Sequence, residues 1–262
     1  MQAFLEELKF RNPEMYFYGL ICLGFSIVCL VLSKTTQVQV LGINAWIKPF
    51  KFAFSTFLYA WAMGWYCAYL PKFNLAFFNW TVIILLGFEI IYIAIQANRG
   101  QLSHFNLSSS FYSTMYSLMA LAASAVTLYT AYVGWLFMAN SFPDLPVAYV
   151  WAIRMALWIF VVFSFEGFLM GSRLTHTIGG PDGGPGIPLL NWSTKFGDPR
   201  VAHFIGMHAL QILPLLAFYL FTNKYGVLFI SILYLSLATF TLVQALKGKP
   251  FVKGRQNVTQ KI

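Results

Sequence analysis

Seven long apolar segments alternate with short polar connections along the chain. They are Tyr16–Leu32, Phe52–Leu70, Trp80–Gln96, Phe111–Phe137, Val147–Gly171, Val201–Phe221 and Val227–Leu246. A helix that crosses the hydrocarbon core of a bilayer needs about 20 mainly apolar residues. Short connections between helices indicate antiparallel neighbours. We therefore predict an all-α integral membrane protein, in which residues 1–262 form a single bundle of seven transmembrane helices.

The composition favours a lipid bilayer as the main partner and argues against nucleic acid. Of the 262 residues, 59% are hydrophobic and 10% are charged, whereas a soluble domain has about 25% charged residues. The net charge of +9 does not indicate nucleic-acid binding, because the basic residues lie beside apolar segments, as membrane topology requires. The three cysteines lie in apolar segments and form neither a disulfide framework nor a metal motif.

Lysine and arginine are distributed unequally between the two sides of the predicted bundle. The odd-numbered connections and the C-terminal tail hold 12 of the 17, the opposite side holds four, and Arg154 lies inside a span. Because cytoplasmic connections carry the excess of basic residues, we predict an outer N-terminus and a cytoplasmic C-terminus. The tail, residues 247–262, is the most basic segment. Its basic residues are Lys247, Lys249, Lys253, Arg255 and Lys261.

The connection of residues 172–200 is long and rich in glycine and proline. Its sequence, SRLTHTIGGPDGGPGIPLLNWSTKFGDPR, excludes a helix. Loops of this length without regular structure are usually functional or disordered. The apolar Ile187–Leu190 and Trp192 predict that this cytoplasmic loop folds back on the bundle or on the membrane interface. It then acts either as a lid or as a passive cap.

The four histidines all fall on the predicted cytoplasmic side. His104 precedes the fourth span, His176 follows the fifth, and His203 and His208 open the sixth. Neutral imidazole is the commonest metal ligand and also binds haem iron. All four histidines are therefore candidate metal ligands.

The sixth span begins with a polar helix face. Four polar side chains of RVAHFIGMHALQILP lie within an arc of about 140°. They are Arg200, His203, His208 and Gln211. The two histidines are five residues apart, so they lack the i,i+3 or i,i+4 spacing of a two-ligand clamp. Either groups from elsewhere complete a site, or both histidines form interhelical hydrogen bonds. Pro214 removes a backbone hydrogen bond and predicts a kink in this span.

Three charged residues lie inside predicted spans, where ionisable groups usually have a partner or a function. Glu89 is either a structural partner of Arg154, the nearest cation by depth, or a ligand, acid–base group or proton carrier. Glu166 is level with the histidines, so we predict that it acts beside them as a ligand or general base. Structural or substrate-binding roles are predicted for Arg99, Arg154, Arg173 and Gln211.

Two lysines flank Pro49 at the start of the second span. Lys48 and Lys51 either reach to phospholipid phosphates or bind the anionic headgroup of a substrate. Nucleotide binding is not indicated, because the chain has no Walker A sequence. The HExxH and GxSxG motifs of common hydrolases are absent as well.

The segments RGQLSHFN and HFIGMHALQILPLL resemble segments of bacterial polytopic membrane proteins that have no assigned activity. The resemblance covers the third through sixth spans. It implies a family of unassigned activity and transfers no role to any residue. With the topology above, we expect a multi-pass protein of the bacterial cytoplasmic (inner) membrane.

These observations favour a metal or haem site near the cytoplasmic face. The cofactor would be zinc, copper or iron, or haem b. With zinc, a bound water of lowered pKa would hydrolyse a lipid-like substrate; with haem or copper, the role would be redox. One alternative is a proton-coupled transporter that uses Glu89, Arg154 and Glu166. Another is a non-catalytic sensor or assembly subunit whose polar groups fasten helices together.

Overall fold

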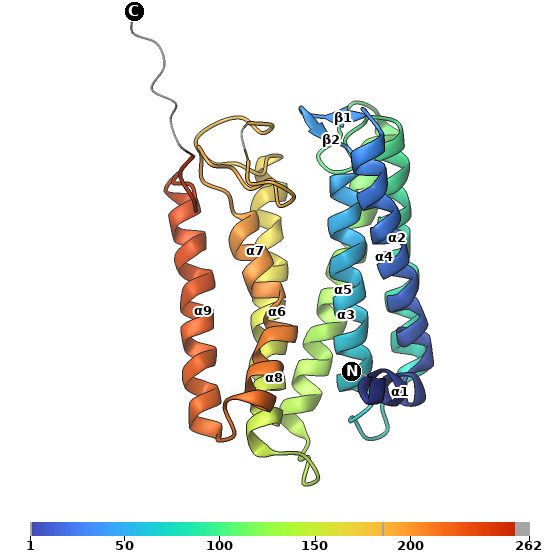
Figure 1. Cartoon of the computed structure of the whole chain (residues 1–262), viewed down its shortest axis with the longest axis vertical. Coiled ribbons are helices and arrows are strands. Elements are labelled where there is room, and N and C mark those ends of the chain that lie inside the picture. The colour runs from blue at the N-terminus through green and yellow to red at the C-terminus, as the bar shows by residue number, and fades with distance from the viewer. Residues whose placement is uncertain (1, 185, 255–262) are drawn as a thin grey trace, which may run out of the picture.

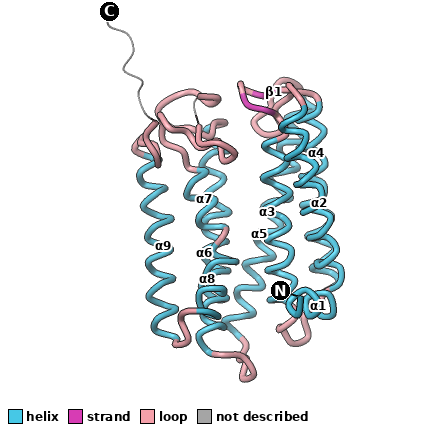
Figure 2. The backbone as a smooth tube through the Cα atoms, viewed as in Figure 1, coloured by secondary structure: helices cyan, strands magenta, loops and turns pink. Residues whose placement is uncertain are grey.

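The computed structural model describes residues 2–184 and 186–254, which form nine helices and one two-stranded hairpin (Figure 1, Figure 2). The helices are α1 (Gln2–Arg11), α2 (Pro13–Thr35), α3 (Ile47–Cys67), α4 (Leu75–Asn98), α5 (Ser110–Ala139), α6 (Val147–Arg173), α7 (Arg200–Met207), α8 (Ala209–Tyr219) and α9 (Lys224–Leu246). The antiparallel hairpin consists of β1 (Gln39–Val40) and β2 (Ile43–Asn44). The prediction of a mostly helical protein is confirmed, whereas α1 and the hairpin were not predicted.

Each predicted apolar segment corresponds to one long helix or, in one case, to two. Within the described part of the chain, five helices are long and apolar enough to cross a membrane: α2, α4, α5, α6 and α9. The pair α7 and α8 provides a sixth crossing if the two helices form one span. The remaining segment, α3, is less apolar and has ten of its 21 residues buried. The chain is therefore a multi-pass membrane protein.

The helix ends follow from local sequence. Asparagine or serine side chains accept a hydrogen bond from the backbone N–H three residues later, which satisfies a donor that the first turn leaves free. The capping residues are Asn12 for α2, Asn74 for α4, Ser109 for α5 and Asn223 for α9. Pro13 follows the first cap at a position where a helix tolerates proline.

The sixth predicted span is broken at His208, where α7 and α8 meet at 44°. The predicted kink at Pro214 is therefore wrong in position. Pro214 lies inside α8, where the Tyr66 hydroxyl satisfies the carbonyl that the proline leaves free. At the break, the hydroxyl of Tyr234 in α9 donates to the carbonyl of Ile205, in the last turn of α7. Neighbouring helices thus hold both irregular backbone positions.

The predicted basic connections gather at one end of the bundle. The hairpin, the loop of residues 174–199 and the C-terminal end of α9 lie there, whereas α1 lies at the opposite end (Figure 1). The connection of residues 99–109 joins them, since a Cβ at Gly100 would lie 3.4 Å from Val38. Two residues of the predicted basic tail, Arg255 and Lys261, lie outside the described residues.

The loop of residues 174–199 is folded onto itself and onto the bundle, as predicted. Two antiparallel bridges fasten it, Ile178 with Gly197 and Gly186 with Ser193. Trp192 is buried, with ring centroids 5.4 Å from Phe204 of α7 and 6.2 Å from Phe251. The loop therefore covers the end of α7, where the predicted histidine site begins.

Candidate functional site

A cavity of about 390 Å³ lies between α3, α4, α5, α6 and the broken helix α7–α8. Its wall is mostly apolar, with phenylalanine, methionine and alanine side chains from several helices. All four histidines nevertheless line it, together with Glu89 and Gln211. The structure therefore brings together polar residues from α4, the 99–109 connection, the 174–199 loop and the broken helix.

His203 in α7 is fixed by close packing of α7 against α6. A Cβ at Gly206 would lie 2.1 Å from the Phe163 side chain, and one at Gly167 would lie 3.2 Å from His203 itself, so both glycines permit the contact. Nδ1 of His203 donates to the carbonyl of Phe163 at 2.7 Å. This leaves Nε2 as the available nitrogen of His203.

Glu166 lies beside His203 without a hydrogen bond to it. Its Oε2 is 3.4 Å from His203 Nδ1, within ion-pair range. The only hydrogen on that nitrogen points to the Phe163 carbonyl, so both buried oxygens of Glu166 have no hydrogen-bond partner among the described residues. Glu166 and His203 are therefore close neighbours at the contact between α6 and α7.

His208 occupies the break between α7 and α8. Its Nδ1 lies 3.2 Å from Oε1 of Gln211, and the Gln211 amide donates to the Leu58 carbonyl at 3.1 Å. The second bond fixes the amide with its oxygen toward the histidine, so His208 Nδ1 is the donor. The ring packs against Phe204 with centroids 4.3 Å apart. As with His203, Nε2 keeps a free lone pair.

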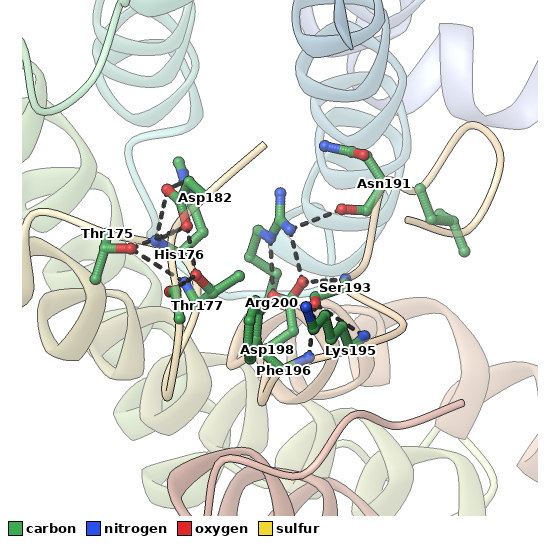
Figure 3. A network of polar contacts seen from close by, with 12 residues as sticks. Thr175, His176, Thr177, Asp182, Asn191, Ser193, Lys195, Phe196, Asp198 and Arg200 are labelled. Carbon is green, nitrogen blue, oxygen red and sulfur yellow. Dashed lines mark hydrogen bonds and ion pairs between the residues drawn. The ribbon is translucent and has the colours of Figure 1, made fainter. Parts of the chain in front are cut away.

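His176 forms a hydrogen-bonded pair with Asp182 in the loop (Figure 3). Its Nδ1 lies 2.8 Å from Oδ2, and its backbone N–H and the hydroxyls of Thr175 and Thr177 also reach the carboxylate. Burial alone would raise the pKa of Asp182, but the hydrogen bonds from His176 lower this pKa by more than burial raises it. The carboxyl group is therefore ionised. Burial lowers the pKa of His176, which is neutral at pH 7 with Nε2 as an acceptor.

Asp182 was not predicted as a site residue. The only sequence signal was an aspartate six residues after a histidine in a glycine-rich turn, GGPDGG. Glycine at this turn lets the backbone reverse, since Gly179 and Gly183 have φ of 94° and 85°. The reversal returns Asp182 to the N–H of His176.

His104 lies in the same cavity wall, but its ring contacts a hydroxyl group in place of a carbonyl or carboxylate oxygen. Its Nδ1 lies 3.2 Å from the Ser103 hydroxyl, and its ring contacts Phe52 and Tyr116 at centroid distances of 5.5 and 6.3 Å. Burial, with a smaller effect of the nearby Lys48 charge, holds the pKa of His104 well below its usual value. This histidine is therefore neutral.

The histidines share an arrangement that is common for metal-ligating or proton-accepting imidazoles. Three use Nδ1 to donate to a carbonyl or carboxylate oxygen, which fixes the tautomer and leaves Nε2 basic. Among residues 2–184 and 186–254, however, no three His, Cys, Asp or Glu side chains lie close enough to hold a metal ion together. The metal or haem site therefore stays a prediction.

One of the alternatives for Glu89, a structural pair with Arg154, is not formed among the described residues. Arg154 lies near the start of α6 and donates to the carbonyls of Phe137 and Asn140 at 2.8 and 3.0 Å. The end of α5 offers carbonyls without helical partners and a negative dipole end, which suit a cation. Glu89 is 6% exposed in the cavity wall, and its Oε1 has no partner among the described residues. Arg154 thus does not link Glu89 to Glu166.

The other predicted arginines lie outside the cavity. Arg99 caps the end of α4 and Arg173 ends α6, and both are exposed and absent from the cavity wall. Arg200 lines the cavity, as do Lys48 and Lys51 at the start of α3. Basic side chains therefore line part of the cavity wall, while the rest of the wall is mostly apolar and includes one glutamate, Glu89.

No protein-family description, curated protein or solved structure matches the chain. The resemblance to bacterial polytopic membrane proteins therefore stays a prediction. The function is inferred from the geometry of the site itself.

Proposed function

We propose that the chain crosses a bacterial inner membrane seven times, with its N-terminus outside and the loop of residues 174–199 in the cytoplasm. The seven crossings are the five long apolar helices, α3, and the broken pair α7–α8. Two observations support this arrangement. The helix α3 runs beside α2 along the bundle (Figure 1), and the basic connections gather at one end. Basic residues mark the cytoplasmic side.

The cavity is, in this proposal, the reaction site for a lipid-like substrate. The observation that supports it is that four histidines from three separate segments line one apolar cavity of about 390 Å³. Apolar walls with a few convergent polar groups are typical of small-molecule sites. Intramembrane polar groups are costly without a use, which favours a function for them.

The hydrogen-bond pattern fits general acid–base chemistry. For an ester substrate, Nε2 of His176 accepts a proton from water while the water oxygen bonds to the acyl carbon or phosphorus of the ester. The bond from this atom to the alkoxide oxygen then breaks, and the leaving alkoxide takes the proton from Nε2. Ionised Asp182 holds the His176 tautomer and stabilises the imidazolium. His203 beside Glu166 offers a second proton-accepting position.

A cofactor-dependent version of the same proposal uses the free Nε2 atoms as ligands for zinc, copper, iron or haem iron. Zinc would supply a water of lowered pKa, whereas copper or haem would supply redox chemistry. The tautomers of His176, His203 and His208 suit ligation, although the described side chains would have to move to share one ion.

The test is turnover and retention of lipid by the purified protein. Wild-type protein in liposomes of total bacterial lipid is expected to consume one lipid class, followed by mass spectrometry. The His176→Gln variant is expected to be at least about 100-fold slower, the usual effect of losing a general base. Ala123→Trp, which fills the cavity, is expected to lose bound lipid. Leu128→Trp, at a 60% exposed position of the same helix, is the control.

A proton-coupled transporter is the second candidate. The observation that favours it is the pair of buried glutamates, Glu89 and Glu166, with oxygens that lack partners. Such groups exchange protons readily when a path opens. Counterflow in liposomes that requires Glu89 and proceeds without lipid turnover would select the transporter over the enzyme.

A further inference from the structure

A second, smaller cavity of about 160 Å³ adjoins the large one at the end of the bundle. The hairpin and the loop of residues 174–199 both contribute to its wall, which includes Asn44, Asp182 and Asn191. Five residues belong to the walls of both cavities. They are Lys48, Lys51, Phe52, His176 and Arg200. The junction between an apolar and a more polar cavity is therefore lined by three basic residues, a histidine and a phenylalanine.

The cations at this junction are not all neutralised. Arg200 is paired, because its guanidinium donates to both oxygens of Asp198 at 2.8 and 2.6 Å. Lys51 donates at 2.9 Å to the carbonyl of Leu190, which carries no charge.

Lys48 lies 6.0 Å from the ring centroid of Phe52 and has no carboxylate within ion-pair distance among the described residues. A carboxylate does lie nearby, since Asp182 lines the smaller cavity. Its oxygens are occupied by the N–H groups of His176 and by the hydroxyls of Thr175 and Thr177. Cations that are withdrawn from water without a counter-charge are costly. An anion placed between Lys48 and Lys51 would relieve this cost.

We infer that the junction binds the phosphate or carboxylate headgroup of a single-chain anionic lipid, whose chain lies in the large cavity. This inference rests on the proposed function, because it assigns the substrate class of the same cavity. It accounts for the arrangement of the two cavities, in which basic residues lie between the smaller, more polar cavity and the larger apolar cavity. It also places the headgroup beside His176, which lines both cavities and is the proton acceptor of the proposed reaction.

A bound headgroup would compete with the loop for the hydrogen-bond donors of Lys51 and Arg200. Lys51 and Arg200 currently hold the loop through the carbonyls of Leu190 and Asn191. Charge-assisted hydrogen bonds to an anion are about twice as strong as those between neutral groups. A bound headgroup therefore competes for the donors that fasten residues 190 and 191.

The test is displacement of a dansyl-labelled undecanoic acid from the full-length protein in neutral detergent. The competitors are dodecyl phosphate, dodecanoate, the uncharged dodecyl glycerol and inorganic phosphate. Wild type is expected to prefer dodecyl phosphate over dodecyl glycerol by about tenfold or more. Lys48→Gln is expected to lose about tenfold in affinity for the anionic chains, the effect of one charge-assisted hydrogen bond. Its affinity for dodecyl glycerol is expected to stay unchanged.

Two matched variants make the result specific. Lys48→Arg keeps the charge and is expected to retain the anion preference, which also shows that position 48 tolerates substitution. Lys34→Gln removes an exposed lysine at the same end of the bundle and is expected to change nothing.

Equal affinity of wild type and Lys48→Gln for dodecyl phosphate would overturn the headgroup site. The proposed function would survive that result if the Ala123→Trp variant still failed to bind the alkyl chain of the lipid. Binding of inorganic phosphate as tight as that of dodecyl phosphate would show a free-anion site and overturn the lipid assignment. If the wild-type protein bound none of the dodecyl compounds and no labelled undecanoic acid, the proposed function would be overturned as well.

Discussion

The hydroxyl of Tyr66 in α3 donates a hydrogen bond to the carbonyl of Leu210 in α8. In a regular helix this carbonyl would accept from the N–H four residues later, which Pro214 lacks. A proline inside a membrane helix is tolerated when a neighbouring side chain supplies the missing donor. The same bond ties the helix that carries Gln211 to α3, and both helices line the cavity.

Tyr66→Phe is expected to destabilise the protein by about 1–3 kcal/mol, because it leaves a buried carbonyl without a donor. The measurement is the midpoint of unfolding in mixed detergent micelles. Tyr225→Phe, at an 80% exposed tyrosine, is the control and is expected to leave the midpoint unchanged. Equal midpoints for both variants would show that the Tyr66 bond contributes nothing.

Gly206→Ala is expected to cost about 1–3 kcal/mol and to disturb His203, because the new methyl group would lie 2.1 Å from Phe163. The clash involves Cβ and Cγ of the phenylalanine, which cannot move without shifting α6. Gly24→Ala is the matched control, since a Cβ there meets nothing within 4 Å. That variant is expected to be neutral or slightly stabilising, as alanine favours a helix. Unfolding midpoints that rank the two variants in the opposite order would contradict the packing described here.

The positions of the helices were accessible from the sequence because the bilayer imposes a length and an apolar composition on each crossing. The break at His208 was not accessible, since Pro214 carried the stronger local signal. The position of the break depends on contacts with neighbouring helices. The Tyr66 hydroxyl donates to the carbonyl that Pro214 leaves free, and the Tyr234 hydroxyl donates to a carbonyl at the break.

The candidate site could be predicted from the sequence only in outline. Charge asymmetry grouped the four histidines on one side, and the structure places all of them in one cavity wall. The partner of Arg154 was missed because the carbonyls at the end of α5 leave no trace in residue types. Asp182 was missed for a related reason. Its role depends on a glycine turn that returns the chain to His176, and composition does not encode that path.

The metal prediction is checked by elemental analysis and an optical spectrum of protein purified without chelators. If the histidines act through a metal, wild type is expected to carry stoichiometric zinc, copper or iron, and haem b would give a Soret band. The double variant His203→Ala/His208→Ala is expected to lose the metal or the band. Unchanged metal content in this variant, measured beside wild type, would exclude these two residues as ligands.

Protection of the loop of residues 174–199 is expected to depend on pH through His176 and Asp182. Both groups have pKa values lowered in the folded protein. For His176 the cause is burial; for Asp182 the hydrogen bonds from His176 outweigh the opposing effect of burial. A lowered folded pKa adds stability above the unfolded value, and this stability is lost as pH falls toward the folded value. With unfolded values of about 6.5 and 3.9, protection should be complete above pH 7 and decline below about 6.5.

The measurement is hydrogen–deuterium exchange of loop peptides, corrected for the intrinsic dependence of exchange on pH. His176→Gln is expected to flatten the decline between about pH 7 and 5, because the titrating group is gone. Asp182→Asn is expected to lower protection already at pH 7, since the amide has one acceptor oxygen in place of two. Loop protection that is the same at pH 5 and pH 7.5 in wild type would contradict the pairing. It would mean that the bridges and Trp192 alone hold the loop closed over the cavity.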